Sequence, residues 1–471
     1  MSSSKPLIVD LDRTLLLTDS LHEQLIRGLF ANPVGLFLCF LSLFRGRAAF
    51  KASLAAKLPL NVETFPLRES FLLWLKKRRD DGLELHLCTG AHQSVANKIA
   101  DRIGLFTSVV GSEAVNLKGR SKAEHLVRMF PDGFVYAGDS RADLVVWQYA
   151  DGIVLVSANA SVDRAARALG KPIEASFPAE TYGIKDWISA VRVHHWSKNI
   201  FIFVPLLLGH DWSNSGAVLT VLLGFFVLLL LISSTYLIND LADLSSDRAH
   251  WSKHHRPIAS GRISIFAAFS TGVGGIIVAL LLGFLIATTF GVALTCYLTL
   301  TLAYSFGLKQ VPLLDTFIIA FLFTLRLIMG TALADQRYSE WLLAFSMFFF
   351  FSLATAKRHT ELLRTFEKGG VSARGYRAED TIVTALFGIS TGVSSLIILA
   401  LYFAEGSFQR ALYHRPAFLW VMPILVGILV GRVWLLAQRG EMRDDPVSFV
   451  LRDRTMLGLG LVAAIAFVLA L

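Results

Sequence analysis

The sequence predicts an α/β domain built on a parallel sheet, followed by an all-α membrane domain of nine helices. Of the 471 residues, 54% are hydrophobic and 17% are charged, against about 25% charged in an ordinary soluble domain. Residues 1–190 carry charges every few positions, whereas residues 199–471 consist of long apolar runs between short polar loops. We therefore predict two domains, residues 1–185 and residues 186–471.

Polar side chains follow the short strand-like runs of the first domain. Asp10, Asp12 and Thr14 come directly after the apolar run Leu7–Val9. In an open parallel sheet, ligands bind at the carboxyl ends of the strands. The other candidate groups are Thr89 after the run 84–88, Lys122 or Lys118 before a helical pattern at 123–129, and Asp139 and Asp143 after the run 133–137.

Together these groups suit the hydrolysis of a phosphate ester. A carboxylate can take the phosphoryl group, a second acid can protonate the leaving oxygen, and a hydroxyl and a lysine can neutralise the transferring oxygens. Further carboxylates can hold Mg²⁺, which screens the approach of one anion to another. In this order, the groups resemble those of the haloacid dehalogenase superfamily of phosphatases over residues 5–160.

This resemblance implies a Rossmann-like haloacid dehalogenase fold with a helical cap at about residues 15–83. It implies Asp10 as the nucleophile, Asp12 as the acid/base and Thr89 as the phosphate-binding hydroxyl. It also implies Lys122 as the lysine, with Lys118 as the alternative. The implied Mg²⁺ ligands are Asp10, Asp12, Asp139 and Asp143. Arg13 stands where this family commonly has Gly, and it either binds a substrate phosphate or points to solvent.

The apolar stretch 29–44 is short and is interrupted by Asn32, Pro33 and Gly35. If it crossed the membrane, the acids before it would be separated from their partners later in the first domain. We therefore predict a helix of that domain, which either rests on the membrane or is buried in the core.

Nine apolar runs of the second domain approach the roughly 17 to 25 residues that cross a bilayer. They lie at 198–212, 216–238, 264–287, 290–307, 312–333, 340–356, 381–403, 417–437 and 455–471. With the first domain in the cytoplasm, the loops on that side hold about 15 Lys and Arg residues and the opposite loops about three. The net charge of +9 lies mainly in these loops. It is not interleaved with stacking aromatic residues, so we expect no nucleic-acid partner. We also expect no secretory signal peptide.

Four oxygen-bearing side chains lie at the inner end of the second span. They are Asn239, Asp240, Asp243 and Asp247. Their spacing places them on one helical face, so we expect their oxygens to converge on one Mg²⁺ ion. In a chain of nine spans, this motif resembles that of the UbiA superfamily of intramembrane prenyltransferases, over residues 190–471. The second Asp-rich cluster typical of that family is missing, and a basic loop at 357–364 takes its place.

The basic loop resembles that of one branch of this superfamily, the polyprenyl-phosphate phosphoribosyltransferases of bacterial envelope synthesis. Further matches to this branch lie at 195–199, at 304–309 with Asp315, at 445–447 and at 451–453. The resemblance implies Asp240 and Asp243 as catalytic acids. The implied substrate-binding residues are Lys198, Asn199, Asn239, Lys253, Arg256, Tyr304, Lys309, Lys357, Arg358 and Glu361.

The two resemblances imply a bifunctional enzyme that depends on Mg²⁺. The second domain would transfer 5-phosphoribosyl from phosphoribosyl diphosphate to a polyprenyl phosphate, and the first would remove the 5-phosphate to give polyprenylphosphoryl ribose. We expect a multi-pass protein among the lipids of the bacterial inner membrane, with both active sites on the cytoplasmic side. The alternatives are an aromatic prenyltransferase that uses a prenyl diphosphate, and a phosphatase whose membrane domain only binds or transports lipid.

Overall fold

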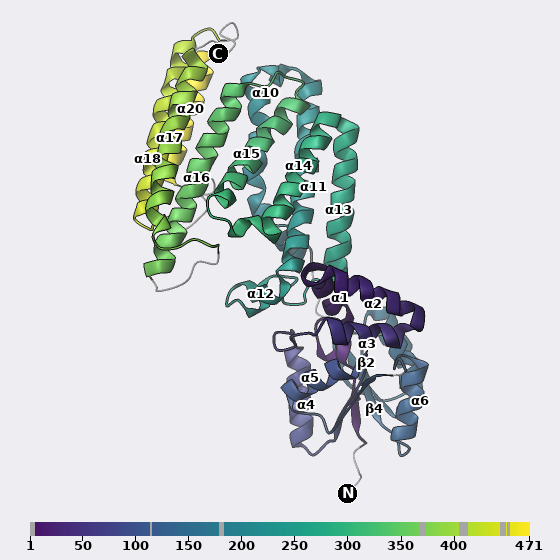
Figure 1. The fold of residues 1–471 in the computed structure, drawn as a ribbon. Coiled ribbons are helices and arrows are strands. Elements are labelled where there is room, and N and C mark those ends of the chain that lie inside the picture. Colours follow the sequence, from purple (N-terminus) through teal and green to yellow (C-terminus); the bar gives the residue numbers. More distant parts are fainter. Residues whose placement is uncertain are drawn as a thin grey trace. The chain divides into compact units, whose positions relative to one another are not determined.

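The computed structural model describes residues 5–113, 115–178, 183–367, 374–404, 413–442, 449 and 453–471. The chain divides into two units (Figure 1). Unit 1 comprises Met1–Val191 and Tyr236–Val273, and unit 2 comprises Arg192–Thr235 and Gly274–Leu471. Unit 1 therefore contains a stretch, 236–273, that belongs to the membrane domain in the sequence analysis.

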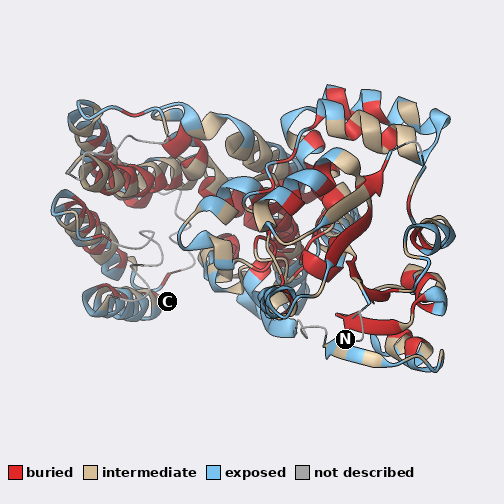
Figure 2. Ribbon diagram, turned by 90° about the horizontal axis from the view of Figure 1, so that it is seen from below, coloured by how far each residue is buried: buried red, intermediate tan, exposed pale blue. Residues whose placement is uncertain are grey.

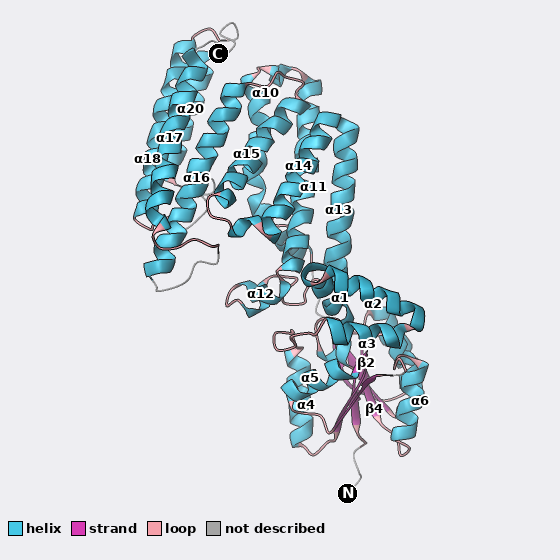
Figure 3. Cartoon of the chain, in the orientation of Figure 1, coloured by secondary structure: helices cyan, strands magenta, loops and turns pink. Residues whose placement is uncertain are grey.

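Unit 1 is built on a six-stranded sheet in which neighbouring strands are parallel (Figure 3). The strands are β1 Leu7–Val9, β2 Leu85–His92, β3 Ser108–Ser112, β4 Val135–Gly138, β5 Gly152–Val156 and β6 Ile173–Phe177, in the order β3-β2-β1-β4-β5-β6. Strands β1, β4 and β5 are buried along their whole length, as is typical of short apolar strands that are covered on both faces. Because β1 lies between β2 and β4, the residues that follow these three strands meet at one edge of the sheet.

Helices pack on both faces of this sheet, and they are α4 Glu69–Asp80, α5 Gln93–Ile103, α6 Arg120–Met129, α7 Leu144–Tyr149 and α8 Ala160–Arg167. Three further helices pack together in a cluster of their own: α1 Ser20–Ala31, α2 Pro33–Leu41 and α3 Arg47–Lys57. Helix α9, Ile184–Ala190, packs with side chains of the stretch 237–268. Leu7 and Val9 pack in one buried cluster with side chains of α4 and α5, whereas Ile8 packs in another with side chains of α6, α7 and α8. Successive strand residues point to opposite faces, so the two clusters cover the two faces of the sheet. Buried residues accordingly concentrate along the strands (Figure 2).

The segment 29–44 is mostly exposed. It forms the end of α1, then α2, and then most of a 3-10 turn, Ser42–Arg45. Leu36 and Cys39 are buried, but Phe37 and Phe44 are 64% and 92% exposed. The segment therefore presents an apolar face to the outside of unit 1.

A buried ion pair joins α1 to a part of unit 1 that is 225 positions further along the chain. Arg248 donates from Nη2 to Oε1 of Glu23 at 2.7 Å and from Nη1 to Oε2 at 3.0 Å. The two side chains are 4% and 6% exposed. The remaining guanidinium nitrogen donates to the carbonyl of Ala259 at 2.9 Å, and the hydroxyl of Thr18 donates to Glu23 at 2.5 Å. Each nitrogen of the guanidinium and each oxygen of the carboxylate thus takes part in a hydrogen bond, which stabilises a buried ion pair.

The described part of unit 2 is helical. The stretch 236–273 of unit 1 holds α12, Leu244–Ala249, together with the end of α11 and the beginning of α13. The helices that lie partly or wholly in unit 2 are α10 Val204–Leu208, α11 Ser215–Ala242, α13 Ile265–Ile286, α14 Thr288–Phe306, α15 Leu314–Leu333, α16 Glu340–Glu367, α17 Asp380–Ala404, α18 Val421–Gln438 and α20 Arg454–Ala470. Helix α16 packs against α15, α17 and α18. Gly388 of α17 lets Trp434 of α18 pack closely against α17, because a side chain at position 388 would collide with this tryptophan.

Seven helices in the described part of the chain are long and apolar enough to cross a membrane, so the prediction of nine spans is wrong. The first expected span, 198–212, is divided into a 3-10 segment, Val193–Phe203, and the short helix α10. Pro205 cannot donate an amide hydrogen bond within a longer helix, and His210 adopts a positive φ of 59°. The last helix, α20, has 17 residues, fewer than the roughly 20 that a span usually needs.

The prediction for the N-terminal part of the fold is corrected as well. This region contains helices and a small parallel sheet, and it carries no clear haloacid dehalogenase fold. Acids and hydroxyls after the strands of a parallel sheet occur in many unrelated α/β proteins. Their order along the chain therefore does not define a fold, and the function of this region has to be argued from its site.

We predict that Glu23→Ala destabilises unit 1, because the change leaves Arg248 buried without its counter-charge. Removing one partner of a buried ion pair costs about 3 to 5 kcal/mol. Thermal unfolding of the purified protein in detergent, followed by tryptophan fluorescence, should show a lower midpoint. The double variant Glu23→Leu/Arg248→Met should recover much of this loss. Asp80→Ala, which removes an exposed acid at the end of α4, is the control. An unchanged midpoint for Glu23→Ala would contradict this account of the ion pair.

Candidate functional site

A cavity of about 390 Å³ lies at the edge of the sheet where β1, β2 and β4 end. We call it the acidic cavity. Its charged and hydroxyl-bearing lining residues are Asp10, Asp12, Arg13, Asp19, His22, Lys51, Thr89, Lys118, Lys122, Asp139, Ser140 and Asp143. All six residues that the sequence analysis assigned to phosphate chemistry in the first domain thus line one cavity.

Three carboxylates in the acidic cavity are close enough to share a cation. One oxygen each from Asp10, Asp139 and Asp143 lies within 4.8 Å of the others. Burial, followed by the charges of the other two acids, raises the pKa of Asp139 to about 8. A divalent cation that prefers oxygen ligands, such as Mg²⁺, would relieve this repulsion. The donor set therefore fits the predicted ion, whereas Asp12, which was also predicted as a ligand, lies outside this group of three.

Lys122 of α6 is fixed among these acids. Its Nζ donates to Oδ1 of Asp10 at 2.7 Å and to the hydroxyl of Tyr136 at 2.9 Å. That hydroxyl in turn donates to Oδ1 of Asp143 at 2.9 Å. Burial would lower the pKa of Lys122, but the charges of the two acids outweigh burial and raise it, so the ammonium stays charged. These contacts place Lys122 beside Asp10, which favours Lys122 over Lys118 as the predicted lysine.

Asp12 and Thr89 have surroundings that suit their predicted roles. Asp12 accepts hydrogen bonds from the main-chain nitrogen and the hydroxyl of Ser20, at 2.8 and 3.1 Å. Burial, followed by the charge of Asp19, raises the pKa of Asp12 to about 7, so this acid can carry a proton near neutral pH. Thr89 is buried, and its hydroxyl oxygen accepts a hydrogen bond from the amide of Ala91 at 3.1 Å.

Lys51 of α3 is a cavity residue that sequence reasoning missed. Its ammonium donates to the carbonyl of Gly90 and to Oδ1 of Asn116 at 2.7 Å. It thereby connects the helices that follow β1 to the end of β2. Burial lowers its pKa, and the nearby charge of Asp12 opposes this effect. Half of the other residues of α3 are alanine, so the local sequence carries no signal of a site.

The second set of predicted metal ligands lies at the end of α11, also in unit 1. Asn239 and Asp240 are part of α11, but the helix is interrupted at Asp243, and Asp247 lies in α12. The helical face on which the four side chains were expected to lie is therefore broken. Oδ1 of Asn239 is buried and has no hydrogen-bond partner among the described residues, so it is an available oxygen ligand.

Two predicted cations pair with these acids. Arg256 donates from Nη1 to Oδ2 of Asp247 at 2.5 Å and to Oδ1 of Asp240 at 3.3 Å. Lys253 lies 3.8 Å from Asp247. Across the described residues, these acids do not form a carboxylate group tight enough to share an ion, in contrast to the three acids of the acidic cavity.

In unit 2, the predicted residue Arg358 is buried in an ion-pair network. Its Nε donates to Oδ2 of Asp315 at 2.8 Å, and its Nη1 donates to Glu361. The hydroxyl of Tyr376 donates to Oδ1 of Asp315 at 2.6 Å. Arg358 therefore connects α16 to α15. The other predicted cations of this unit, Lys198, Lys309 and Lys357, are partly exposed. The matches at 445–447 and 451–452 lie outside the described residues.

Two further predicted residues of unit 2 are paired with arginines. Oδ1 of Asn199 accepts a hydrogen bond from Nε of Arg326 at 2.8 Å, and Nη2 of this arginine donates to the hydroxyl of Tyr297 at 3.1 Å. The hydroxyl of Tyr304 accepts a hydrogen bond from Arg374 at 2.7 Å. Sequence reasoning missed Arg326, although a single arginine within the apolar helix α15 is a signal of a buried, paired charge.

Residues 199–459 match the model of the UbiA prenyltransferase family, and residues 1–198 lie outside this match. Protein y4nM of Sinorhizobium fredii, described as uncharacterized, is 43% identical over 476 residues, which cover 99% of this chain and 91% of that protein. Decaprenyl-phosphate phosphoribosyltransferase of Corynebacterium glutamicum is 31% identical over 252 residues, which cover 51% of this chain and 74% of that protein.

A solved structure is similar as well. It is a UbiA homolog from Archaeoglobus fulgidus bound to GPP and Mg²⁺, which is 16% identical with a TM-score of 0.45 and covers 60% of this chain and 98% of that one. The match to the family model covers more than half of the chain. The chain therefore belongs to the UbiA prenyltransferase family, and with its seven candidate spans it is a multi-pass integral membrane protein.

Proposed function

We propose that this chain is a membrane enzyme that catalyses two consecutive steps on a lipid. In the first step, 5-phosphoribosyl passes from phosphoribosyl diphosphate to a polyprenyl phosphate. In the second step, the acidic cavity removes the 5-phosphate and leaves polyprenylphosphoryl ribose. The observation that carries the proposal is the meeting of Asp10, Asp139, Asp143 and Lys122 in one cavity of a chain whose membrane region resembles a phosphoribosyltransferase.

The transfer step is supported by the 31% identity to the enzyme of Corynebacterium glutamicum. An oxygen of the polyprenyl phosphate forms a bond to C1 of the ribose, the bond from C1 to the diphosphate breaks, and diphosphate leaves. The oxygens available for a Mg²⁺ ion here are those of Asn239, Asp240, Asp243 and Asp247. Such an ion would offset the charge of the diphosphate. Arg256 and Lys253, which contact two of these acids, are the cations best placed to bind a diphosphate at the same site.

In the hydrolysis step, the carboxylate of Asp10 attacks the phosphorus, and the 5-oxygen leaves with the proton of Asp12. The same Asp12 then deprotonates a water molecule, which attacks the phosphorus, releases inorganic phosphate and restores Asp10. A pKa of about 7 suits Asp12 to both tasks near neutral pH. Lys122 and Thr89 neutralise the transferring oxygens. Mg²⁺ held by the three cavity carboxylates would screen the charge of the phosphate from that of Asp10.

We place both steps on the cytoplasmic side of a bacterial inner membrane. The connection between α11 and α13, which belongs to the same unit as the first domain, carries Arg248, Lys253, Arg256 and Arg262, and this positive charge supports the orientation. The acids at the end of α11 and the acidic cavity both belong to unit 1. A lipid that stays at one face of the membrane would therefore reach the second site at a high effective concentration.

Asp243→Asn should abolish the formation of ribosylated lipid, because it removes a carboxylate ligand of the donor's metal ion. Hydrolysis of ribose 5-phosphate by the same preparation should continue, since that reaction uses the acids of the other site. Both activities are measured on purified protein with radiolabelled substrates and Mg²⁺. Ser245→Ala, an exposed change two positions away, is the control. Lipid product at the normal rate from Asp243→Asn would disprove the metal assignment.

Asp10→Asn should cause the 5-phosphorylated ribosyl lipid to accumulate. A neutral amide cannot act as the nucleophile, so hydrolysis stops, whereas the transferase step uses another site and continues. Asp12→Asn should accumulate the same lipid and also retain a phosphorylated enzyme, since the group that activates water is missing. Mass analysis of extracted lipids and acid-quenched protein detects both species. Asp101→Asn, which alters an exposed acid on α5, is the control. Complete dephosphorylation of the lipid by Asp10→Asn would refute this role.

A further inference from the structure

A second cavity, of about 500 Å³, adjoins the acidic cavity. The two share the lining residues Arg13, Asp139 and Ser140. We call this second space the arginine cavity, because its lining includes four arginines, Arg13, Arg68, Arg141 and Arg262. The lining includes one acid, Asp139, which already belongs to the carboxylate group of the acidic cavity. The arginine cavity is therefore positively charged and opens beside the proposed phosphate site.

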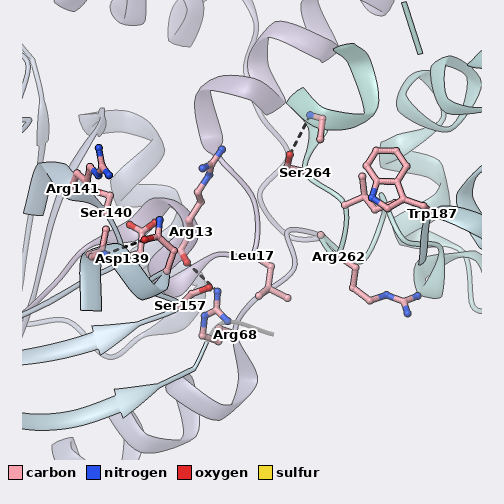
Figure 4. Close-up of a pocket in the computed structure, with 15 residues that line it drawn as sticks. Arg13, Leu17, Arg68, Asp139, Ser140, Arg141, Ser157, Trp187, Arg262 and Ser264 are labelled. Atoms are coloured by element: carbon pink, nitrogen blue, oxygen red, sulfur yellow. Dashed lines mark hydrogen bonds between the residues drawn. The ribbon is translucent and has the colours of Figure 1, made fainter. Parts of the chain in front are cut away.

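The two ends of the arginine cavity differ in character. Arg13, Asp139 and Arg141 lie on one side of it, and Trp187, Arg262 and Ser264 lie on the other (Figure 4). Ser264 directly precedes α13, which is one of the seven candidate membrane spans, and Ala267 of that helix also lines the cavity. The cavity thus leads from the acids to the first turn of a helix long and apolar enough to enter a bilayer.

Two of the four arginines serve the structure. Arg68 donates from Nε and Nη2 to the carbonyls of Thr14 and Arg13, each at 3.1 Å, and so holds the loop after β1. Arg262 donates to Oδ1 of Asp186 at 2.9 Å, and this acid offsets its charge.

The other two arginines have donors to spare. Arg141 is exposed, and its contact with the hydroxyl of Ser161 is 3.3 Å long. Arg13 is exposed, and within the described residues no hydrogen bond holds its guanidinium. Its φ of 61° is a left-handed conformation that residues other than glycine rarely adopt, and Arg68 donates a hydrogen bond to its carbonyl oxygen. This backbone turn places Arg13 at the junction of the two cavities.

We propose that the arginine cavity binds the phosphodiester of a lipid-linked phosphate monoester while the terminal phosphate of the same molecule lies in the acidic cavity. The proposal rests on the phosphatase function proposed above and adds a second binding subsite, which restricts the substrate class to lipid-linked esters. Arg141 and Arg13 would contact the phosphodiester oxygens, and the lipid chain would leave towards α13. A soluble phosphate monoester has no group to fill this cavity. The site therefore selects esters that remain attached to a membrane lipid.

The test compares two substrates of the full-length protein in neutral phosphatidylcholine nanodiscs. Polyprenylphosphoryl-5-phosphoribose carries both a phosphodiester and a terminal phosphate, whereas ribose 5-phosphate carries the terminal phosphate alone. Phosphate release gives kcat/KM for each substrate. The quantity compared between variants is the ratio of kcat/KM for the lipid substrate to kcat/KM for ribose 5-phosphate. Arg141→Gln should lower this ratio about tenfold through the loss of a charge-assisted hydrogen bond, mainly by raising KM for the lipid. Arg164→Gln, an exposed arginine of α8 outside both cavities, should keep the ratio of the unmodified protein.

Three other outcomes would overturn the proposal, and each shows which part of it fails. An unchanged ratio for Arg141→Gln, with ribose 5-phosphate still hydrolysed, would remove the substrate class and leave the phosphatase function standing. Hydrolysis of neither substrate by the unmodified protein would remove both. A third arm adds phosphatidylglycerol to the nanodiscs. If this lipid raises KM for the lipid substrate in the unmodified protein but not in Arg141→Gln, the cavity holds any anionic phospholipid, and the substrate assignment fails.

Discussion

The buried ion pair between Glu23 and Arg248 is the contact on which the architecture of unit 1 depends. It ties α1, which follows the first strand, to a segment more than 200 positions later that leaves one membrane helix and enters the next. Both side chains are buried and each makes a further hydrogen bond, so the loss of either partner would leave the other charge buried without its counter-charge. A buried apolar cluster that includes Ile26, Leu237 and Leu241 joins the same two stretches, and the acidic cavity, the acids at the end of α11 and the arginine cavity all lie in this unit.

The same requirement, that a buried charge needs a partner, organises the described polar groups of both units. Arg358 is matched by Asp315 and Glu361 in unit 2, and Arg256 is matched by acids of the α11 motif in unit 1. The acidic cavity departs from this balance, since three clustered carboxylates face one buried lysine, which pairs directly with Asp10. This surplus of negative charge is the physical basis for placing Mg²⁺ there. The neighbouring arginine cavity has the opposite surplus, which is the basis for placing an anion beside it.

The sequence was informative where a short apolar strand ends in polar residues. Burial of such a strand fixes where its last residue lies, so Asp10 and Asp139 could be assigned to one edge of a sheet from pattern alone. The same reasoning could not assign the fold of this region, because many α/β proteins share that arrangement. This reasoning could not predict the role of Lys51 or the Glu23–Arg248 pair, since both depend on contacts between segments that are distant in the sequence. Hydropathy also overcounted the spans, because an apolar average does not register the interruption of a helix by Pro205.

The central claim is that one chain forms a ribosylated lipid and then dephosphorylates it. The most direct measurement incubates the unmodified protein in nanodiscs with polyprenyl phosphate, Mg²⁺ and phosphoribosyl diphosphate labelled with ³²P at the 5-phosphate. The lipids and the released phosphate are followed over time. The account predicts a labelled lipid that rises and then falls, labelled inorganic phosphate that appears after it, and a final lipid with the mass of polyprenylphosphoryl ribose. The absence of any ribosylated lipid, together with product formation from a prenyl diphosphate and an aromatic acid, would contradict it.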